Sequence, residues 1–166
     1  MEELKRVKLF KSMVKSTATN LKILSDIDAA YLAGLFDGDG CFFIMKVNKK
    51  FRHNRSHGYV PYMRLTNTDR IIIDLCNEYG GHWLSQDQTA KWKCVYRWML
   101  STRLAKWYLP QIFPYIRIKR KQAGVFLKAL EQCHGTGHSQ DKLKMGKYRM
   151  QLQLLNRRGK KKGRLP

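Results

Sequence analysis

The stretch "YLAGLFDGDGCFFI", residues 31–44, decides the fold because a helix pattern turns into a strand pattern within a few residues. Its first part is small and apolar and predicts a helix that ends near Phe36, whereas its last part is aromatic and β-branched. Asp37 and Asp39 alternate with glycines at the junction. A helix C-terminus carries the negative end of the helix dipole, so each carboxylate is disfavoured there by up to about 1 kcal/mol.

These two acids predict a divalent metal ion. Gly38 and Gly40 permit a sharp left-handed exit from the helix, which explains the glycines but not the acids. Carboxylate and carbonyl oxygens that converge at a helix end are the ligands that Mg²⁺ prefers. We therefore expect Mg²⁺ at the junction, with Mn²⁺ as a substitute.

Small residues line one face of the same helix. Ala30, Ala33, Gly34 and Asp37 follow one another at spacings of three, one and three, which places them on one side. Such a stripe lets a second helix approach closely, and no other predicted helix of the chain offers a matching one. The simplest partner is the same helix of a second copy, related by a two-fold axis. The alternative is a tight contact within one chain.

Positive charge is the strongest compositional signal. The chain of 166 residues holds 33 Lys and Arg against 12 Asp and Glu, a net charge of +21 at pH 7. Nucleic acid is the first partner that this charge predicts, and an anionic membrane surface is the second. The sequence has no run of about 18 apolar residues, which argues against a membrane span.

The bases gather in blocks, at 5–22, 46–64, 117–121 and 157–164. A single basic block is usually a solvated surface, but four blocks with few acids favour nucleic acid. The block 46–64 has no acid and interleaves its bases with aromatic residues. We expect DNA contacts from these bases and their neighbours, namely Lys46, Lys49, Lys50, Arg52, Arg55, Arg64, Lys91, Lys93, Arg97, Arg117 and Lys121.

The predicted elements follow the order helix, two strands, helix, two strands, helix, helix. Ser25 with Asp28 marks the first helix start, and Gly80-Gly81 ends the second helix. This order predicts an α+β fold, with a four-stranded antiparallel sheet and helices on one face. The domain would span 25–140, between a basic extension at 1–24 and a basic tail at 141–166. The helices are expected at 25–36, 68–79, 101–112 and 121–132, and the strands at 41–48, 59–66, 82–86 and 92–100.

The free face of such a sheet suits the major groove of DNA, because β-ribbons fit the groove and project alternate side chains at base edges. Single-stranded RNA on an aromatic sheet is the competing ligand. The aromatic pattern typical of RNA-binding sheets does not occur in the sequence, which favours DNA.

The segment "LAGLFDGDG", residues 32–40, resembles the nine-residue signature of the LAGLIDADG homing endonucleases and differs from it only at Phe36 and Gly38. Later segments resemble further landmarks of that family in the same order, so that the resemblance covers about 26–133. One copy of the signature is present, and single-motif members of the family are homodimers joined by the signature helix. The later landmarks are "LTNTDRIIIDL" with the following Gly80-Gly81, "YRWML" and "PYIRIKRKQA".

The resemblance implies roles for several residues. Asp39 matches the metal-binding carboxylate, and the carbonyl of Gly38 matches a backbone ligand. Lys119 matches the basic residue near the scissile phosphates, although a plain phosphate contact is the alternative. Asn67 stands where the family more often has Gln to order water, and Arg70 is the candidate for an accompanying base.

The implied function is a homodimeric, Mg²⁺-dependent endonuclease that cuts both strands of a long pseudo-palindromic DNA site. Family members are encoded by mobile introns or inteins, and a free chain with its own Met1 favours the intron form. The protein would act beside its host genome, in a prokaryotic cytoplasm or an organelle, with no membrane partner and no small-molecule substrate. Rival functions are a non-cleaving RNA maturase, a DNA-binding regulator, and a basic ribosome-associated protein.

Overall fold

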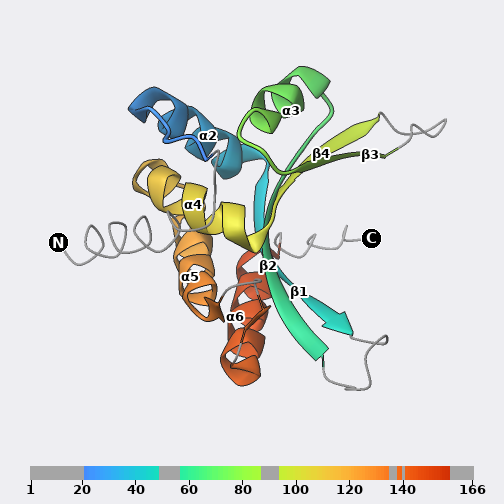
Figure 1. Cartoon of the computed structure of the whole chain (residues 1–166), viewed down its shortest axis with the longest axis vertical. Coiled ribbons are helices and arrows are strands. Elements are labelled where there is room, and N and C mark those ends of the chain that lie inside the picture. Colours follow the sequence, from blue (N-terminus) through green and yellow to red (C-terminus); the bar gives the residue numbers. More distant parts are fainter. Residues whose placement is uncertain (1–20, 49–56, 87–93, 135–137, 140, 158–166) are drawn as a thin grey trace, which may run out of the picture.

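The computed structural model describes residues 21–48, 57–86, 94–134, 138–139 and 141–157. As predicted, the fold is α+β and built on an antiparallel sheet. Figure 1 shows α4, α5 and α6 together on one side of that sheet. No helix in these ranges is both long and apolar enough to cross a membrane.

The main sheet has the strand order β1-β2-β4-β3, and every neighbouring pair is antiparallel. A separate two-stranded ladder, which the sequence did not predict, joins β5 (Cys133–His134) to β6 (His138–Ser139). The strands of the main sheet are β1 (Gly40–Asn48), β2 (His57–Asn67), β3 (His82–Gln86) and β4 (Val95–Leu100). The helices are α2 (Asp26–Gly38), α3 (Arg70–Asn77), α4 (Thr102–Ile112), the 3₁₀ turn η1 (Phe113–Tyr115), α5 (Arg120–Glu131) and α6 (Lys142–Leu155).

Helix α2 begins where the sequence predicts. The Ser25 hydroxyl accepts the backbone N–H of Asp28 at 3.1 Å and donates to the Asp28 carboxylate at 2.7 Å, which caps the first turn. The helix ends at Gly38. Asp39 is its C-cap, and the backbone N–H of Asp39 makes a last bond to the carbonyl of Leu35 at 2.9 Å.

The predicted left-handed exit from α2 is wrong. Among the described residues only Gly80 and Gly81 have positive φ, at 78° and 106°. Gly40 is needed for a different reason, since a Cβ there would lie 2.5 Å from the Cα of Phe36. The first residue of β1 therefore packs directly against the backbone of α2, and this close approach places the strand under the helix end.

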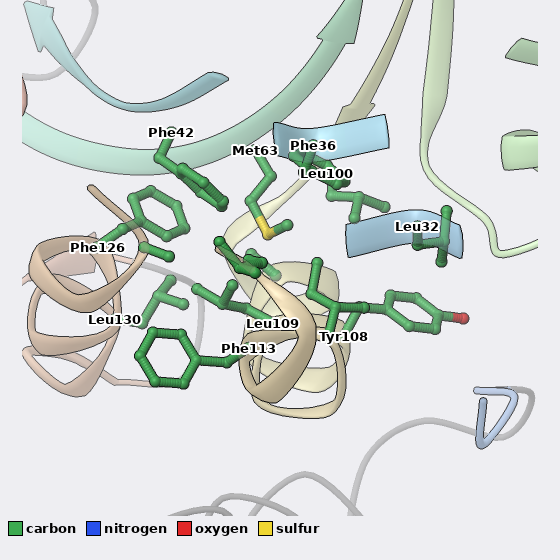
Figure 2. Close-up of a cluster of buried hydrophobic side chains, with 14 of the residues drawn as sticks. Leu32, Phe36, Phe42, Met63, Leu100, Tyr108, Leu109, Phe113, Phe126 and Leu130 are labelled. Atoms are coloured by element: carbon green, nitrogen blue, oxygen red, sulfur yellow. The ribbon is translucent and has the colours of Figure 1, made fainter. Parts of the chain in front are cut away.

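The core lies between the helices and one face of the sheet. Alternate residues of β1, β2 and β4 point into it, because successive side chains of a strand face opposite sides. Phe36 of α2 stacks on Phe42 of β1 with ring centroids 5.6 Å apart, and Phe42 meets Phe126 of α5 at 5.5 Å. Figure 2 shows Phe42 and Met63 of the sheet facing the side chains of these helices. Each such buried side chain stabilises the fold by about 1.5–3 kcal/mol.

Helix α3 begins at Arg70, two residues after the start of the predicted range 68–79, and ends at Asn77. The Asp69 side chain caps it by accepting the backbone N–H of Ile71 at 2.9 Å. The two glycines end the segment, and the indole N–H of Trp98 donates to the carbonyl of Gly80 at 2.7 Å. This bond ties the connection after α3 to β4.

Residues 142–155, predicted as part of a basic tail, instead form α6. Met145 and Leu152 are buried, and their spacing of seven residues places them on one face of the helix. The side-chain amide of Asn156 donates to the carbonyl of Phe42 at 3.0 Å, on the edge strand β1. The sequence did not predict this helix because its exposed face is rich in bases. A solvated basic tail has the same composition.

Candidate active site

Asp39 and Asn67 meet where α2 ends. The side-chain amide of Asn67 donates to Oδ2 of Asp39 at 2.8 Å, and its Oδ1 accepts the backbone N–H of Asp69 at 2.8 Å. The pairing of Gly40 with Leu65 brings the start of β1 beside the end of β2. The Asp39 side chain is exposed, so its carboxylate faces solvent while the amide of Asn67 fixes one oxygen.

Asp37 has a partner inside its own chain. Its two carboxylate oxygens accept the backbone N–H groups of Arg117 and Lys119 at 2.7 and 2.8 Å, just before α5. Partial burial alone would raise the pKa of this carboxyl, but the backbone donors of Lys119, Arg117 and Ile118 and the Lys119 charge together lower it. The helix start of α5 therefore accounts for one of the two acids that the sequence left unexplained.

The Lys119 side chain caps the C-terminal end of α2. Its ammonium donates to the carbonyls of Phe36, Gly38 and Gly40 at 3.0, 2.8 and 2.7 Å. A positive charge is favourable at the negative end of a helix dipole. The predicted catalytic lysine is thus brought to the site, where it bonds the carbonyl that the sequence predicts as a metal ligand.

Arg70 lies near this group but points along its own helix. Its Nε donates to the carboxylate of Asp74, one turn further on, at 3.2 Å. Both side chains are largely exposed, so the ion pair contributes little stability. The structure joins Asp39, Asn67 and Lys119 around the end of α2, and places Arg70 at the start of α3.

The oxygen atoms at the end of α2 suit a hard cation. The Asp39 carboxylate and the Gly38 carbonyl are ligand types that Mg²⁺ takes, and Mg²⁺ usually completes its shell with water and phosphate oxygens. Within the described ranges, no group of three or more His, Cys, Asp and Glu side chains could hold a metal ion.

The sheet has a second face, opposite the core, which we call the open face. Arg64 of β2 and Arg97 of β4 lie on it, because Met63, Leu65 and Trp98 beside them are buried in the core. Lys46 does not, since it shares the side of Phe42 and Ile44, which are buried in the core. Of the other predicted DNA contacts, Arg117 and Lys121 are exposed near α5. Lys49, Lys50, Arg52, Arg55, Lys91 and Lys93 lie outside the described residues.

The outward face of α2 differs from the predicted stripe. Ala30 and Gly34 are exposed, but Ala33 has no exposed surface and packs in the core with Leu32 and Phe36. The exposed face instead includes Ile27 and Tyr31, whose side chains are 82% and 48% exposed. A spacing of four residues joins these two and could have revealed them in the sequence.

Comparison with solved structures shows a shared fold. The homing endonuclease I-CvuI in complex with its target has a TM-score of 0.63 at 18% identity, over 81% of this chain and 85% of that one. The archaeal intron-encoded homing endonuclease I-Vdi141I, complexed with DNA, has a TM-score of 0.61 at 16% identity, over 82% and 89%. The LAGLIDADG homing endonuclease I-SmaMI, bound to cleaved DNA, has a TM-score of 0.50 at 18% identity, over 69% and 38%. No protein-family model and no curated protein matches the sequence.

Proposed function

We propose that this chain, which has the fold of the LAGLIDADG homing endonucleases, is a site-specific endonuclease that hydrolyses double-stranded DNA. The observation that carries the proposal is the meeting of Asp39, Asn67 and Lys119 around the end of α2. This group lies at the end of a sheet whose open face holds Arg64 and Arg97. An exposed carboxylate repels phosphate, so a protein that only binds DNA gains nothing from it. A nuclease can use the same carboxylate to hold a metal ion beside the phosphate.

Hydrolysis of a phosphodiester needs an activated water and positive charge on the phosphate oxygens. The Asp39 carboxylate and the Gly38 carbonyl would hold Mg²⁺, which when bound supplies a water of lowered pKa and neutralises phosphate charge. Asn67 orients the carboxylate, since its amide is itself fixed by the backbone of Asp69. Lys119 adds a positive charge beside the same carbonyl.

A second copy completes the proposed enzyme. One chain offers one Asp39, whereas cutting both strands of a duplex takes two such carboxylates. The exposed Ile27, Tyr31 and Gly34 of α2 form a face on which the same helix of another copy would pack. A two-fold dimer would place one sheet on each half of a pseudo-palindromic site.

Intron homing is part of the proposal, as is an intracellular place beside the host genome. The support is the name of one structural neighbour, an archaeal intron-encoded homing endonuclease. Non-cleaving binding, as an RNA maturase or a DNA-binding regulator, is the second candidate function. The observation that favours it is the contact of Lys119 with three carbonyls, which engages the ammonium with acceptors of its own chain.

The test begins with duplexes that the full-length protein retains from a randomised library in Ca²⁺. A retained duplex is then incubated with the protein in Mg²⁺, in Mn²⁺ and in a chelator. We expect both strands to be cut with Mg²⁺ or Mn²⁺, and Asp39→Asn to bind the duplex without cutting it. The matched control is Glu131→Gln, an exposed acid at the end of α5, which should cut at the normal rate.

The remaining outcomes separate the two candidate functions. A duplex that is bound but never cut in either metal would identify a regulator. Retention of structured RNA without any retained duplex would identify a maturase. Full cleavage by Asp39→Asn would remove this carboxylate from the mechanism.

A further inference from the structure

The open face of the β1–β2 hairpin changes its chemistry with distance from Asp39. The strand register gives four rungs on this face. The rung nearest the site is polar, the second is aromatic, and the outer two are aliphatic. In that order the rungs are Cys41 with Arg64, Phe43 with Tyr62, Met45 with Val60, and Val47 with Gly58.

Both arginines of the described open face lie at the catalytic end. Arg64 is directly opposite Cys41, two residues along the strand from Asp39. Arg97 is opposite Thr66, next to Asn67. The outer rungs carry no charge, and the Met45 side chain is 41% exposed. The hairpin therefore offers two different surfaces to a bound duplex.

Arg64 is held in place by stacking. Its guanidinium carbon lies 5.1 Å from the ring centroid of Phe43, and that ring stacks on Tyr62 at 5.9 Å with an interplanar angle of 24°. The Nε atom of Arg64 is shielded from solvent and has no hydrogen-bond partner in the described structure. The terminal nitrogens are thus the donors that Arg64 can present outward. A cation fixed over a ring loses less conformational entropy when it binds.

We propose that Arg64 reads a guanine beside the cleavage position, and that Met45 and Val60 read thymine methyl groups further out. This inference rests on the proposed function, because it assumes that the open face lies in the major groove. Arginine pairs with the O6 and N7 atoms of guanine, and apolar side chains pack on the thymine methyl.

The distance between the predicted guanine and thymine positions follows from the rise per residue of a strand and the rise per base pair of DNA. A strand advances about 3.3 Å per residue and DNA about 3.4 Å per base pair, so one residue along the hairpin matches about one base pair. Arg64 and Val60 are four residues apart on β2. Each half-site should therefore show a guanine near the centre and thymines about four base pairs outward.

The test is selection from a randomised duplex library with the full-length protein in a chelator, so that only binding is measured. For the wild type we expect the guanine and the outer thymines at this spacing. Arg64→Ala should lower the preference for guanine at its position by about tenfold or more and leave the outer thymines unchanged. Phe43→Leu should weaken the same preference, because it removes the ring that positions Arg64 but keeps an apolar residue.

Two further variants complete the design. Met45→Gln should weaken the thymine preference at the outer position, where Val60 remains, and leave the guanine. Lys46→Ala is the matched control, since Lys46 is an exposed base of the same strand on the side of Phe42 and Ile44. We expect it to weaken binding to all sequences alike, with no change in base preference.

The inference is overturned if Arg64→Ala keeps the guanine, if the outer positions show no thymine, or if Lys46→Ala changes the selected bases. A wild-type protein that enriches no duplex overturns both this inference and the proposed DNA binding. A wild type that enriches the expected pattern but does not cut it in Mg²⁺ supports the inference and contradicts the endonuclease.

Discussion

The carboxylate of Asp37 accepts the backbone N–H of Lys119, and the ammonium of Lys119 donates to the carbonyls of Phe36, Gly38 and Gly40 on either side of Asp37. Asp37, on α2, thus caps the start of α5, and Lys119, just before α5, caps the end of α2. The negative charge lies at the start of α5 and the positive charge at the end of α2, as the two helix dipoles favour. This reciprocal contact fixes the backbone that presents Asp39.

Asp37→Asn should lower the free energy of unfolding by about 1–2 kcal/mol at pH 6, because it removes a charged acceptor from two backbone donors. The pKa of Asp37 is lowered from its ordinary value of 3.8 in the folded protein. Its charge therefore stabilises the fold above pH 3.8, and this stabilisation is lost as the pH falls below that value. Urea denaturation at pH 6, 4.5 and 3.5 checks this. A difference between the two proteins that stays constant over this range would contradict the assignment.

Lys119→Met should destabilise the free protein by about 1–2 kcal/mol, because three carbonyls lose a charged donor. It should also slow cleavage of the selected duplex. Lys121→Met, two residues further on at an exposed position of α5, should change stability by less than about 0.5 kcal/mol. Denaturation and cleavage assays on both variants give the comparison. Wild-type stability of Lys119→Met would show that these contacts do not support the helix end.

Asn67→Ala should slow cleavage by about 10–100-fold, the usual cost of removing a residue that orients a metal ligand. The affinity for the duplex in Ca²⁺ should stay within about twofold, because Asn67 contributes no charge. Asn67→Gln keeps the amide donor on a longer side chain and should retain more activity than Asn67→Ala. Single-turnover cleavage measures the rates. Equal rates for the alanine variant and the wild type would separate Asn67 from the chemistry.

Gly34→Leu should prevent dimer formation and leave the fold of the chain intact. A Cβ at this position would have no atom of the described residues within 4 Å apart from its own helix, so a larger side chain projects into the face where the second copy would pack. Ala33→Leu is the contrasting variant, since Ala33 is fully buried and a larger residue should destabilise the core by about 1–3 kcal/mol. Sedimentation velocity measures assembly. A dimer that persists in Gly34→Leu would place the interface elsewhere.

Gly40→Ala should cost about 3 kcal/mol of stability, whereas Gly38→Ala, at a helical position with room for a Cβ, should leave stability unchanged or raise it by up to about 1 kcal/mol. A Cβ on Gly40 would lie 2.7 Å from the carbonyl oxygen of Phe36, but one on Gly38 would have no atom of the described residues within 4 Å apart from its own helix. Thermal denaturation of the two variants provides a matched pair. Equal melting temperatures would show that the strand can move away from α2.

The sequence by itself determined the features that depend on neighbouring residues. The Ser25 cap of α2 and the Gly80-Gly81 end after α3 are local, because a cap or a turn is made by residues a few positions apart. Alternation within the strands and the signature segment were likewise readable from the order of residues. These signals sufficed for the α+β fold.

Only the tertiary structure decided what depends on contacts between distant segments. The partner of Asp37 lies 80 positions away at Arg117, so no local pattern could reveal it. Lys46 and Arg64 both lie on predicted strands, but register sends them to opposite faces, and a shift of one residue would exchange those faces. Ala33 and Ala30 are equally small, so only the packing of α2 on the sheet decides which one enters the core and which one stays exposed.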